Sequence, residues 1–465
     1  MKQLATIDSL SWDTQLIKRH DLAGPRYTSY PTALQFDSSL TATDLMQQAK
    51  SSTDIKQPLS LYFHVPFCAH VCYYCACNKV ITAQRQRSQP YLDTLYKEMQ
   101  YMSEQYSGSR KVEQLHIGGG TPTFLSDSQL GELMDKTRQL FNLVGDDQGD
   151  FSIEIDPREC SPETLHNLRQ LGFNRISIGI QDLQHNVQEA VNRVQPTEQI
   201  VELINQARAE GFKSINVDLI YGLPLQSVES FSDTLTQVIE MSVDRLSVFN
   251  YAHMPDRFRP QRHIRDQDLP SAQQKLAIQR QTIKQLTEAG YIYIGMDHFA
   301  KPSDELSLAQ ASGQLQRNFQ GYTTHADCDL VAMGVSAISK IGDLYYQNSH
   351  DLPVYTQLVE SQQHAICRGV ALSHDDKIRR DLIKELICHC YLDINEFAAQ
   401  QQIDFAQYFA TELVELQLLA DDKLLDLTEN SIQLSATGRL LVRRVCMIFD
   451  RYLPKAQQQK FSRII

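Results

Sequence analysis

Three cysteines in one short segment are the residues of this chain with the clearest capacity for chemistry. Cys68, Cys72 and Cys75 are spaced as C-x3-C-x2-C and follow an apolar, strand-like run. Such a loop can supply three thiolates to a four-iron, four-sulfur cluster and leave the fourth iron without a protein ligand. An open iron can bind a further molecule, so the cluster would act as a reagent as well as an electron carrier.

The same loop has a second interpretation, in which its cysteines hold a structural zinc ion. A fourth cysteine, Cys77, follows closely and would complete a set of four sulfur ligands. Structural zinc sites usually place their ligand pairs on two separated turns, whereas these four sulfurs crowd into one short loop. We therefore favour the iron–sulfur interpretation and expect Cys77 outside the cluster, either as a lone thiol in the site or as an ordinary loop residue. The six remaining cysteines are scattered and read as small apolar core residues.

A run of three glycines, Gly118 to Gly120, precedes Thr121 and Pro122. Consecutive glycines let the backbone pass close to a ligand and leave amides free to bind a carboxylate or an amine-bearing group. The plainer alternative is a tight turn between a strand and a helix. The run lacks both the G-x-G-x-x-G pattern and the lysine of a phosphate loop, so it does not support a nucleotide phosphate site. Its expected place beside the cysteine loop favours ligand binding.

Short apolar runs alternate with amphipathic stretches over about two hundred residues. The stretches at 90–106, 126–141, 161–171 and 197–209 have helical periodicity, and helix-opening residues stand at Ser126 and Ser161. Strands that are each followed by a helix predict a parallel sheet with right-handed crossovers, curled into a partial (β/α)6 barrel. The predicted strands lie at residues 59–64, 114–117, 151–155, 175–180, 214–220 and 245–250.

Polar motifs follow the predicted strands, where barrels of this kind gather their chemistry. All of them are expected to face one mouth. Taken singly, Glu154 or Asp218 at a strand end could equally be an ordinary polar rim residue, but the shared location favours a functional site. The motifs are Cys68 after the first strand, Gly118–Pro122 after the second, Glu154 and Asp156 after the third, Gln181 and Asp182 after the fourth, Asp218 and Tyr221–Pro224 after the fifth, and Tyr251–His253 after the sixth.

The composition indicates a protein that is not exported and has no nucleic-acid or membrane partner. A formal net charge of -12 disfavours nucleic acid, and no apolar run approaches the roughly 18 residues of a membrane span. The first residues lack the apolar core of a signal peptide, and ten cysteines in so long a chain do not read as a disulfide framework. We expect a monomer in the reducing cytoplasm.

The length of 465 residues suits one large catalytic unit with appendages. We expect an N-terminal arm at residues 1–50, a catalytic barrel with an extension at 51–345, and a mainly helical C-terminal domain at 346–465. In the last segment, 376–392 and 405–419 read as helices and 424–434 as a hairpin that leads into another helix. A winged-helix-like shape can bind DNA, but acidic residues load this hairpin region, so we favour a lid or packing role. They are Asp421, Asp422, Asp426 and Glu429.

Several motifs together resemble one enzyme family. The cysteine segment from Tyr62 to Cys77 and the glycine run resemble the radical S-adenosylmethionine (SAM) superfamily. Residues 24–32, 294–299, 318–324 and 334–339 resemble, more narrowly, the oxygen-independent coproporphyrinogen III oxidase family of haem biosynthesis. The resemblance extends to the last five residues, 461–465. It implies an α/β fold, a partial (β/α)6 radical-SAM barrel with an N-terminal arm and a mainly helical C-terminal domain.

The nearest rival is the haem-chaperone branch of the same superfamily, which binds haem without decarboxylase activity. That branch typically has an aromatic residue where this chain has Cys77, and it lacks an arm like residues 26–31. Both features favour the oxidase family. Tyr74 and Ala76 stand where phenylalanine and glycine are common in the family, and these conservative changes cast little doubt on the resemblance.

The resemblance implies a radical decarboxylation. Coproporphyrinogen III would lose the carboxylates of two propionate side chains and yield the vinyl groups of protoporphyrinogen IX. The β-carbon of a propionate has no acidic hydrogen, so a 5'-deoxyadenosyl radical, made from SAM at the [4Fe-4S] cluster, would abstract it. The protein would hold substrate and SAM together and exclude water and oxygen. An electron donor and an electron acceptor are required, and the sequence identifies neither.

The resemblance also implies roles for single residues. Cys68, Cys72 and Cys75 would ligate one [4Fe-4S] cluster. The family holds two SAM molecules, and the first would contact Tyr62, Gly119, Glu154, Ala252 and Ile338. The second would contact Tyr74, Cys77, Gly120, Thr121, Gln181, Arg193 and Asp218. Tyr62, Cys77 and Arg26 would take part in catalysis.

A substrate with four carboxylates needs a local positive field in an acidic protein. Arg26 in the arm could contribute to it and help Tyr27 to close the site. A basic segment after the sixth predicted strand either adds to that field or is a solvated loop, and the sequence does not separate these alternatives. Its residues are Arg257, Arg259, Arg262, His263 and Arg265.

Overall fold

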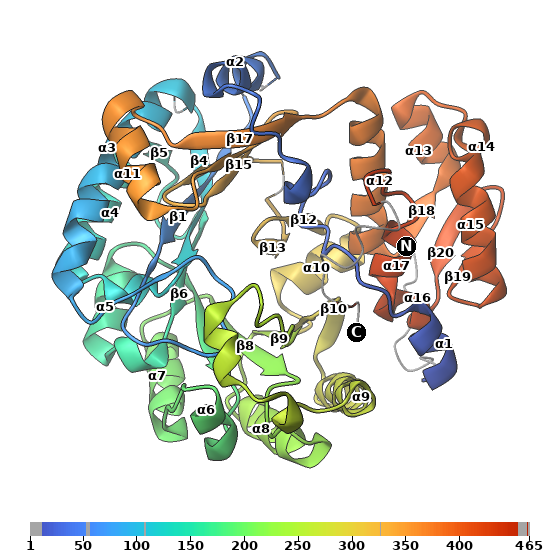
Figure 1. Ribbon diagram of the computed structural model, residues 1–465, viewed down its shortest axis with the longest axis horizontal. Coiled ribbons are helices and arrows are strands. Elements are labelled where there is room, and N and C mark those ends of the chain that lie inside the picture. Colours follow the sequence, from blue (N-terminus) through green and yellow to red (C-terminus); the bar gives the residue numbers. More distant parts are fainter. Residues whose placement is uncertain (1–11, 53–55, 107, 326, 454–462, 464–465) are drawn as a thin grey trace. The chain divides into compact units, whose positions relative to one another are not determined.

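The six predicted strands pair as parallel neighbours in the computed structural model of this chain (Figure 1). They are β1 (Leu59–Val65), β4 (Lys111–Gly119), β6 (Asp150–Ile155), β7 (Arg175–Gln181), β8 (Ser214–Tyr221) and β9 (Arg245–Asn250). Their order is β9-β8-β7-β6-β4-β1. Burial along β7 alternates strictly, so its isoleucines face one side and its polar residues the other. One face of the sheet is therefore apolar and the other is polar.

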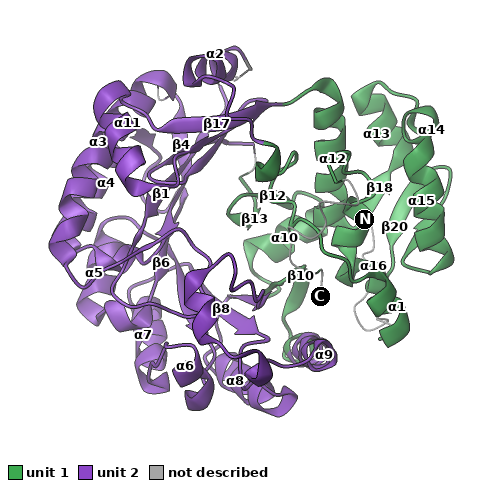
Figure 2. Ribbon diagram, in the orientation of Figure 1, with its two compact units in different colours: residues 1–35, 286–326, 372–465 green, residues 36–285, 327–371 purple. Residues whose placement is uncertain are grey.

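Residues 12–52, 56–106, 108–325, 327–453 and 463 are those that the structure describes. The chain forms two compact units (Figure 2). The barrel unit comprises residues 36–285 and 327–371, and the second unit comprises 1–35, 286–326 and 372–465. Each unit joins segments that are far apart in the sequence. The units therefore do not correspond one to one with the three consecutive segments expected from the sequence, whose boundaries stay a prediction.

Helices cover the apolar outer face of the barrel strands (Figure 1). The predicted openings are confirmed: Ser126 caps α4 through a capping box with Gln129, and Ser161 caps α5 with Pro162 in its first turn. Each cap satisfies backbone amides that a helix start leaves without partners. The helices are α3 (Ser88–Tyr106), α4 (Asp127–Leu140), α5 (Pro162–Gln170), α6 (His185–Ala190), α7 (Thr197–Ala209), α8 (Val228–Glu240) and α9 (Ala272–Glu288).

The sheet of the barrel unit continues beyond the six predicted strands. The strand β14 (Asp329–Met333) pairs in parallel with the free edge of β1, and three antiparallel strands follow it. They are β15 (Ile338–Ile341), β16 (Leu344–Asn348) and β17 (Ile366–Ala371). The helices α2 (Ala42–Ser52) and α11 (Leu352–Gln362) belong to the same unit. We expected an extension of the barrel within residues 51–345, but we did not predict these strands or the continuation to residue 371. The strands are short, and β14 reaches β1 only across a long stretch of sequence.

A buried carboxyl group fixes the turn between β14 and β15. Glu98 of α3 is 0% exposed and accepts hydrogen bonds from the Gly334 amide at 2.8 Å, the Asn348 side-chain amide at 2.6 Å and the Tyr355 hydroxyl at 2.6 Å. Burial raises the pKa of Glu98 to about 7, although these three hydrogen bonds act in the opposite direction. The helix α3 is thereby tied to the turn that leads to Ile338.

The raised pKa predicts how Glu98 affects stability at different pH values. A carboxyl group with a higher pKa in the folded state contributes stability at low pH that is lost as the pH rises through the folded value. Glu98→Gln removes the titration. Between about pH 5.5 and 7.5 the free energy of unfolding of the unmodified protein should therefore fall by about 2 kcal/mol relative to the variant. Urea denaturation at several pH values measures this difference.

Glu104→Gln is the matched control, because Glu104 lies on the same helix with its side chain exposed. Its curve of stability against pH should follow that of the unmodified protein. If the curve of Glu98→Gln also ran parallel to that of the unmodified protein, the buried carboxyl group would not titrate as described.

The second unit has its own hydrophobic core, built mainly by its C-terminal helices. The predicted hairpin is confirmed as β19 (Leu425–Leu427) and β20 (Ser431–Leu434), which form an antiparallel sheet with β18 (Tyr391–Asp393). The predicted helix at 405–419 is interrupted at Phe409, which separates α14 (Phe405–Tyr408) from α15 (Ala410–Asp421). Phe409 is 0% exposed and its ring contacts Phe405 and Phe449, so packing of this side chain accompanies the break.

The remaining elements of the second unit are short, apart from the 16-residue helix α12. They are α1 (Thr14–His20), β10 (Ile292–Gly295), β11 (His298–Ala300), α10 (Glu305–Ser312), β12 (Gln316–Asn318), β13 (Gly321–Thr323), α12 (His374–His389), α13 (Ile394–Gln401), α16 (Ala436–Leu440) and α17 (Val442–Cys446). Across the described part of the chain, none of the helices has the length and apolarity needed to traverse a lipid bilayer.

Candidate active site

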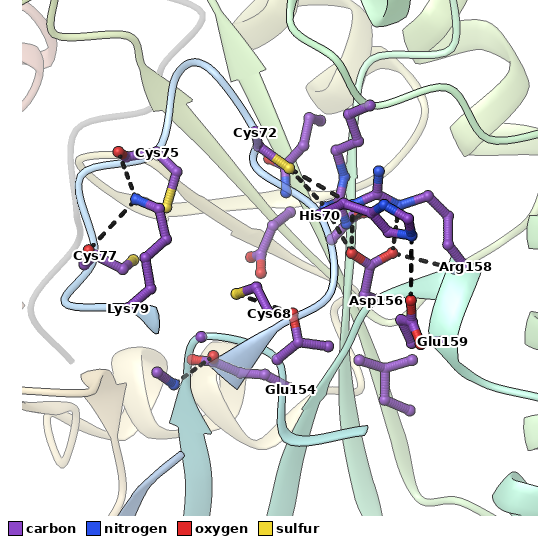
Figure 3. A pocket seen from close by; sticks show the side chains of 18 of the residues that line it. Cys68, His70, Cys72, Cys75, Cys77, Lys79, Glu154, Asp156, Arg158 and Glu159 are labelled. Atoms are coloured by element: carbon purple, nitrogen blue, oxygen red, sulfur yellow. Dashed lines mark hydrogen bonds and ion pairs between the residues drawn. The ribbon is translucent and has the colours of Figure 1, made fainter. Parts of the chain in front are cut away.

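Polar residues from five of the six barrel strands border one cavity (Figure 3), whereas Asp182 and the predicted motifs at 221–224 and 251–253 are not part of its lining. Figure 3 shows the sulfurs of Cys68, Cys72 and Cys75 around the same space. The cavity brings together most of the residues singled out from the sequence. Those that line it are Cys68, Cys72, Tyr74, Cys75, Cys77, Gly119, Gly120, Thr121, Glu154, Gln181, Arg193 and Asp218.

Main-chain hydrogen bonds hold the cysteine loop at both ends. Its first cysteine ends the short strand β2 (Phe67–Cys68), which pairs in parallel with β3 (Val80–Ile81) after the loop. On the other side, the amide of Gly120 donates to the carbonyl of Val65 at 2.8 Å, and the amide of Thr121 donates to Phe67 at 2.8 Å. The glycine turn and the cysteine loop are therefore joined through their backbones.

The close approach of the glycine turn to the backbone of residues 64–67 requires residues without side chains. A Cβ atom at Gly120 would lie 2.7 Å from the Phe67 carbonyl oxygen and 2.8 Å from the Pro66 carbonyl carbon, both backbone atoms. A Cβ atom at Gly119, which has a φ of 121°, would meet the His64 ring at 2.7 Å. The glycine run thus serves as the tight turn of the plainer interpretation and also lines the cavity.

The three thiols have different surroundings. The Thr121 hydroxyl donates to Cys68 Sγ at 3.4 Å, and Cys72 Sγ accepts from Arg193 at 3.4 Å and Arg158 at 3.5 Å. Burial raises the pKa of Cys68 to about 11. The neighbouring side chain of Cys77 is the main cause that lowers the pKa of Cys75 to about 5. Hydrogen-bond donors and cations therefore lie close to the sulfurs, as thiolate ligands require.

Asp156 joins two arginines behind Cys72. Its Oδ2 accepts from Arg158 at 2.7 Å and from Arg193 at 2.9 Å, and all three side chains are largely buried. Burial alone would raise the pKa of Asp156, but the two guanidinium groups outweigh it and lower the pKa to about 2. Arg193 also donates to the Gly179 carbonyl oxygen at 2.6 Å, while its Nε is buried and has no hydrogen-bond partner among the described residues. These contacts hold the Arg193 side chain at the wall of the cavity.

Glu154 presents a carboxylate beside the glycine turn. One of its oxygens accepts the Gly119 amide at 3.0 Å, and the other lies 3.4 Å from His116 Nε2. Burial disfavours its charged form, but the interactions with His116 and Gly119 outweigh this effect and lower the pKa of Glu154. The carboxylate is therefore positioned and ionised where a ligand with an amino group or hydroxyls would meet it.

A polar layer inside the barrel positions these acids. His116 Nδ1 lies 2.6 Å from the Ser152 hydroxyl, and its ring stacks on Tyr62 at 5.9 Å between ring centroids. Further round, Asp218 accepts from Ser177 at 2.8 Å and from Asn216 at 2.9 Å. Sequence reasoning missed His116, Ser152, Ser177 and Asn216. These polar residues alternate with buried apolar residues along their strands. The alternation places them on the inner face of the barrel and could have identified them from the sequence.

Four of the residues predicted to bind SAM or to take part in catalysis lie outside the lining of this cavity as the described side chains define it. Tyr62 lies deeper in the barrel, with its hydroxyl 3.1 Å from His64 Nδ1. Ala252 follows β9, and its carbonyl oxygen accepts from Gln261 at 3.2 Å. Ile338 begins β15 and is half-buried. Arg26 belongs to the second unit, where it forms an ion pair with Asp297.

Known proteins match this chain over nearly its whole length. Family models for the radical SAM superfamily and the HemN C-terminal domain match residues 62–238 and 372–441. A Pseudomonas aeruginosa protein named oxygen-independent coproporphyrinogen III oxidase is 54% identical over 459 residues, which cover 99% of this chain and 100% of that protein. This chain belongs to the oxygen-independent coproporphyrinogen III oxidase family. The Escherichia coli K12 protein of that name is 51% identical over 99% of this chain and 100% of its own length.

A solved structure agrees with the family assignment. The structure described as "Coproporphyrinogen III oxidase (HemN) from Escherichia coli is a Radical SAM enzyme" matches with a TM-score of 0.91 and 51% identity. The match covers 96% of this chain and 100% of that one. The predicted family and the predicted α/β radical SAM fold with a helical C-terminal region are therefore confirmed.

Membership of the radical SAM superfamily implies a [4Fe-4S] cluster and SAM, and the cavity fits both groups. Three free cysteines lie on one loop, with donors at two of their sulfurs. The guanidinium group of Arg193, a lining residue of the cavity, can pair with a carboxylate. The carboxylates of Glu154 and Asp218 can accept an amino group or ribose hydroxyls. A set of donors and acceptors of this kind suits an amino-acid-bearing nucleoside beside a metal cluster.

The close approach at the glycine turn predicts the effect of one methyl group. Gly120→Ala should displace the cysteine loop, because the atoms that it would meet are backbone and cannot turn aside. We expect a loss of about 1–3 kcal/mol in the free energy of unfolding and less iron bound after anaerobic reconstitution. Chemical denaturation and iron analysis measure the two effects.

Gly131→Ala provides the control. Gly131 lies in α4, and a Cβ atom there would meet nothing within 4 Å. This variant should gain about 0.5–1 kcal/mol, because alanine favours a helix interior over glycine. Equal behaviour of the two variants would contradict the packing argument.

Proposed function

We propose that this protein catalyses the oxygen-independent oxidative decarboxylation of coproporphyrinogen III to protoporphyrinogen IX in haem biosynthesis. The observation that carries the proposal is the identity of 54% over 99% of the chain with a protein named for this activity. The three-cysteine loop beside an acid-lined cavity supports it. We infer further that the enzyme acts as a cytoplasmic monomer, which cell fractionation and gel filtration would test.

The reaction sets the task of the chain's own residues. When bound and reduced by one electron, the cluster would supply the cleavage of SAM to methionine and a 5'-deoxyadenosyl radical, which would abstract a hydrogen atom from the β-carbon of a propionate. Loss of carbon dioxide and of one further electron to an acceptor then leaves a vinyl group. The reaction occurs on two side chains. The protein's contribution is to bind, orient and enclose the reactants.

The proposed cofactor-binding residues follow from the resemblance to the family. Cys68, Cys72 and Cys75 are proposed as cluster ligands. The first SAM is assigned to Tyr62, Gly119, Glu154, Ala252 and Ile338. Within that set, the Glu154 carboxylate would accept from the SAM amino group or ribose, and Ile338 would pack on the adenine. Of these five residues, Gly119 and Glu154 line the cavity.

A second SAM is proposed in the same cavity. Its contacts are Tyr74, Cys77, Gly120, Thr121, Gln181, Arg193 and Asp218, all of which line the cavity. The Arg193 guanidinium group would pair with the carboxylate of this molecule. Equilibrium dialysis with the reconstituted enzyme should find two SAM molecules bound per chain, and one per chain would refute the second site.

Tyr62, Cys77 and Arg26 are proposed as catalytic residues. Arg26 is one-third exposed even though it pairs with Asp297, so part of its guanidinium group remains accessible to a propionate. Arg26→Ala should weaken binding of coproporphyrinogen III while cluster content and SAM binding stay unchanged. If Arg26→Ala left substrate affinity and turnover unchanged, Arg26 would have no role in binding the substrate.

Anaerobic reconstitution tests the function itself. The reconstituted protein should be brown, should cleave SAM only when reduced, and should release two molecules of carbon dioxide per coproporphyrinogen III. Cys72→Ser should lose the cluster and all decarboxylation, because serine is a poor ligand for this iron site. Absorbance, iron content and carbon dioxide release measure these outcomes.

Cys367→Ser is the matched control, because Cys367 is exposed on β17 and is not among the residues that line the cavity. It should keep both cluster and activity. Stoichiometric uptake of haem without carbon dioxide release would instead indicate a haem chaperone. A colourless protein that binds zinc would indicate a structural metal site.

A further inference from the structure

A short basic turn follows the last barrel strand. It consists of residues 257–263, with the sequence Arg-Phe-Arg-Pro-Gln-Arg-His, and we call it the basic turn. Arg257, Arg259 and Arg262 are exposed. The chain has a formal net charge of -12, so three exposed arginines within six residues are a local concentration of positive charge on an acidic protein. Neither the binding of the cluster nor that of SAM uses them.

The basic turn is anchored directly to the cysteine loop. Gln261 is 1% exposed, and its Nε2 donates to the carbonyl oxygen of Tyr74 at 3.0 Å. Its Oε1 accepts from the Met254 amide at 2.6 Å. The His263 ring stacks on Tyr73, with ring centroids 4.6 Å apart and planes tilted by 20°. A buried glutamine and a ring stack thus fix the turn against the segment between the second and third cysteines.

Apolar packing makes the same connection. Ile264, next to the basic turn, is buried in a small cluster against which Tyr73 and Tyr74 pack. Tyr74 is the residue before the proposed cluster ligand Cys75. The basic turn and the cysteine loop therefore form one packed body, with the arginines on its solvent-facing side.

The arginine charges are not neutralised within the chain. Arg257, Arg259 and Arg262 have no carboxylate within 4.0 Å in the described portion of the protein, and Arg262 Nε donates to the carbonyl oxygen of Pro255 at 3.0 Å. Arg265, by contrast, pairs with Asp268 at 2.7 Å. The acidic neighbour Asp266 lies 3.0 Å from His253. Three unpaired cations thus face solvent beside the cysteine loop.

We propose that the basic turn is the docking surface for a small acidic one-electron carrier protein that reduces the cluster. The inference rests on the proposed function, which requires an external electron for each SAM cleaved. The inner side of the cysteine loop borders the cavity that holds SAM, so the electron enters from the outer side, where the basic turn packs. One electron passes from the carrier to the cluster: the carrier is oxidised by one unit, the cluster is reduced by one unit, and no bond is made or broken.

Charge complementarity selects this partner. Electron-transfer encounters use small, transient interfaces, and attraction between opposite charges speeds their formation. An acidic carrier would be repelled by most of this protein, with its negative net charge, and attracted to the three arginines. The surface therefore favours a productive orientation beside Cys75 over contact elsewhere.

Charge reversal tests the proposal. The triple variant Arg257→Glu, Arg259→Glu and Arg262→Glu, in the reconstituted holoenzyme, should lower the second-order rate of cluster reduction by reduced flavodoxin at least tenfold at low ionic strength. The difference should shrink as salt is added, because salt screens exposed charges. Stopped-flow absorbance of the cluster measures the rate independently of turnover.

A second triple variant is the matched control. Lys50→Glu, Lys111→Glu and Lys136→Glu change the net charge equally on elements other than the basic turn, namely α2, β4 and α4. It should reduce the rate far less. An equal loss in both triples would show an effect of net charge alone and would overturn the docking surface. An unchanged carrier rate with weaker coproporphyrinogen III binding would overturn it in favour of substrate capture.

Dithionite separates this inference from the proposed function. It should reduce the cluster and support SAM cleavage in both triple variants. If dithionite-reduced, unmodified protein cleaves no SAM, the proposed function fails. If it does cleave SAM, but the substitutions in the basic turn do not change the rate at which the carrier reduces the cluster, only the docking surface fails.

Discussion

The contact between the glycine turn and the cysteine loop is the constraint on which the site depends. Gly120 and Thr121 donate main-chain hydrogen bonds to Val65 and Phe67, and no side chain stands between the two backbones. The loop is therefore held by main chain, and its cysteine side chains remain free to face the cavity. A cluster held by Cys68, Cys72 and Cys75 alone, as proposed, would need this fixed framework, because no fourth cysteine ligand would correct a misplaced loop.

Charge is balanced locally in a protein that is acidic as a whole. Asp156 forms ion pairs with two arginines that lie beside Cys72. The carboxyl groups of Glu154 and Asp218 line the cavity. Cations therefore lie near the sulfurs, and anions lie where a positively charged cofactor would bind. His116 holds Glu154, and Ser177 and Asn216 hold Asp218, through contacts inside the barrel. These polar side chains of the barrel interior therefore fix the positions of the two carboxylates.

The sequence predicted what is encoded locally. Each strand, the turn after it and the helix that follows lie within about 50 residues, and the cysteine and glycine motifs lie at strand ends where a parallel sheet brings them together. Contacts between distant residues were not predictable in this way. Glu98 meets Gly334 across 236 residues, and Arg158 reaches Cys72 across 86. The break at Phe409 and the discontinuous units likewise follow from packing, which no local pattern records.

The position of β14 has a consequence for how the chain is made. The strand β1 is almost wholly buried, yet one of its two neighbours, β14, begins only at Asp329. During synthesis, a nascent chain that has completed β1 to β9 still exposes an apolar strand edge, of the kind that recruits other chains into aggregates. The segment at residues 62–238 that matches the superfamily would therefore be a poor choice of fragment for expression, since it lacks the strand that seals the edge.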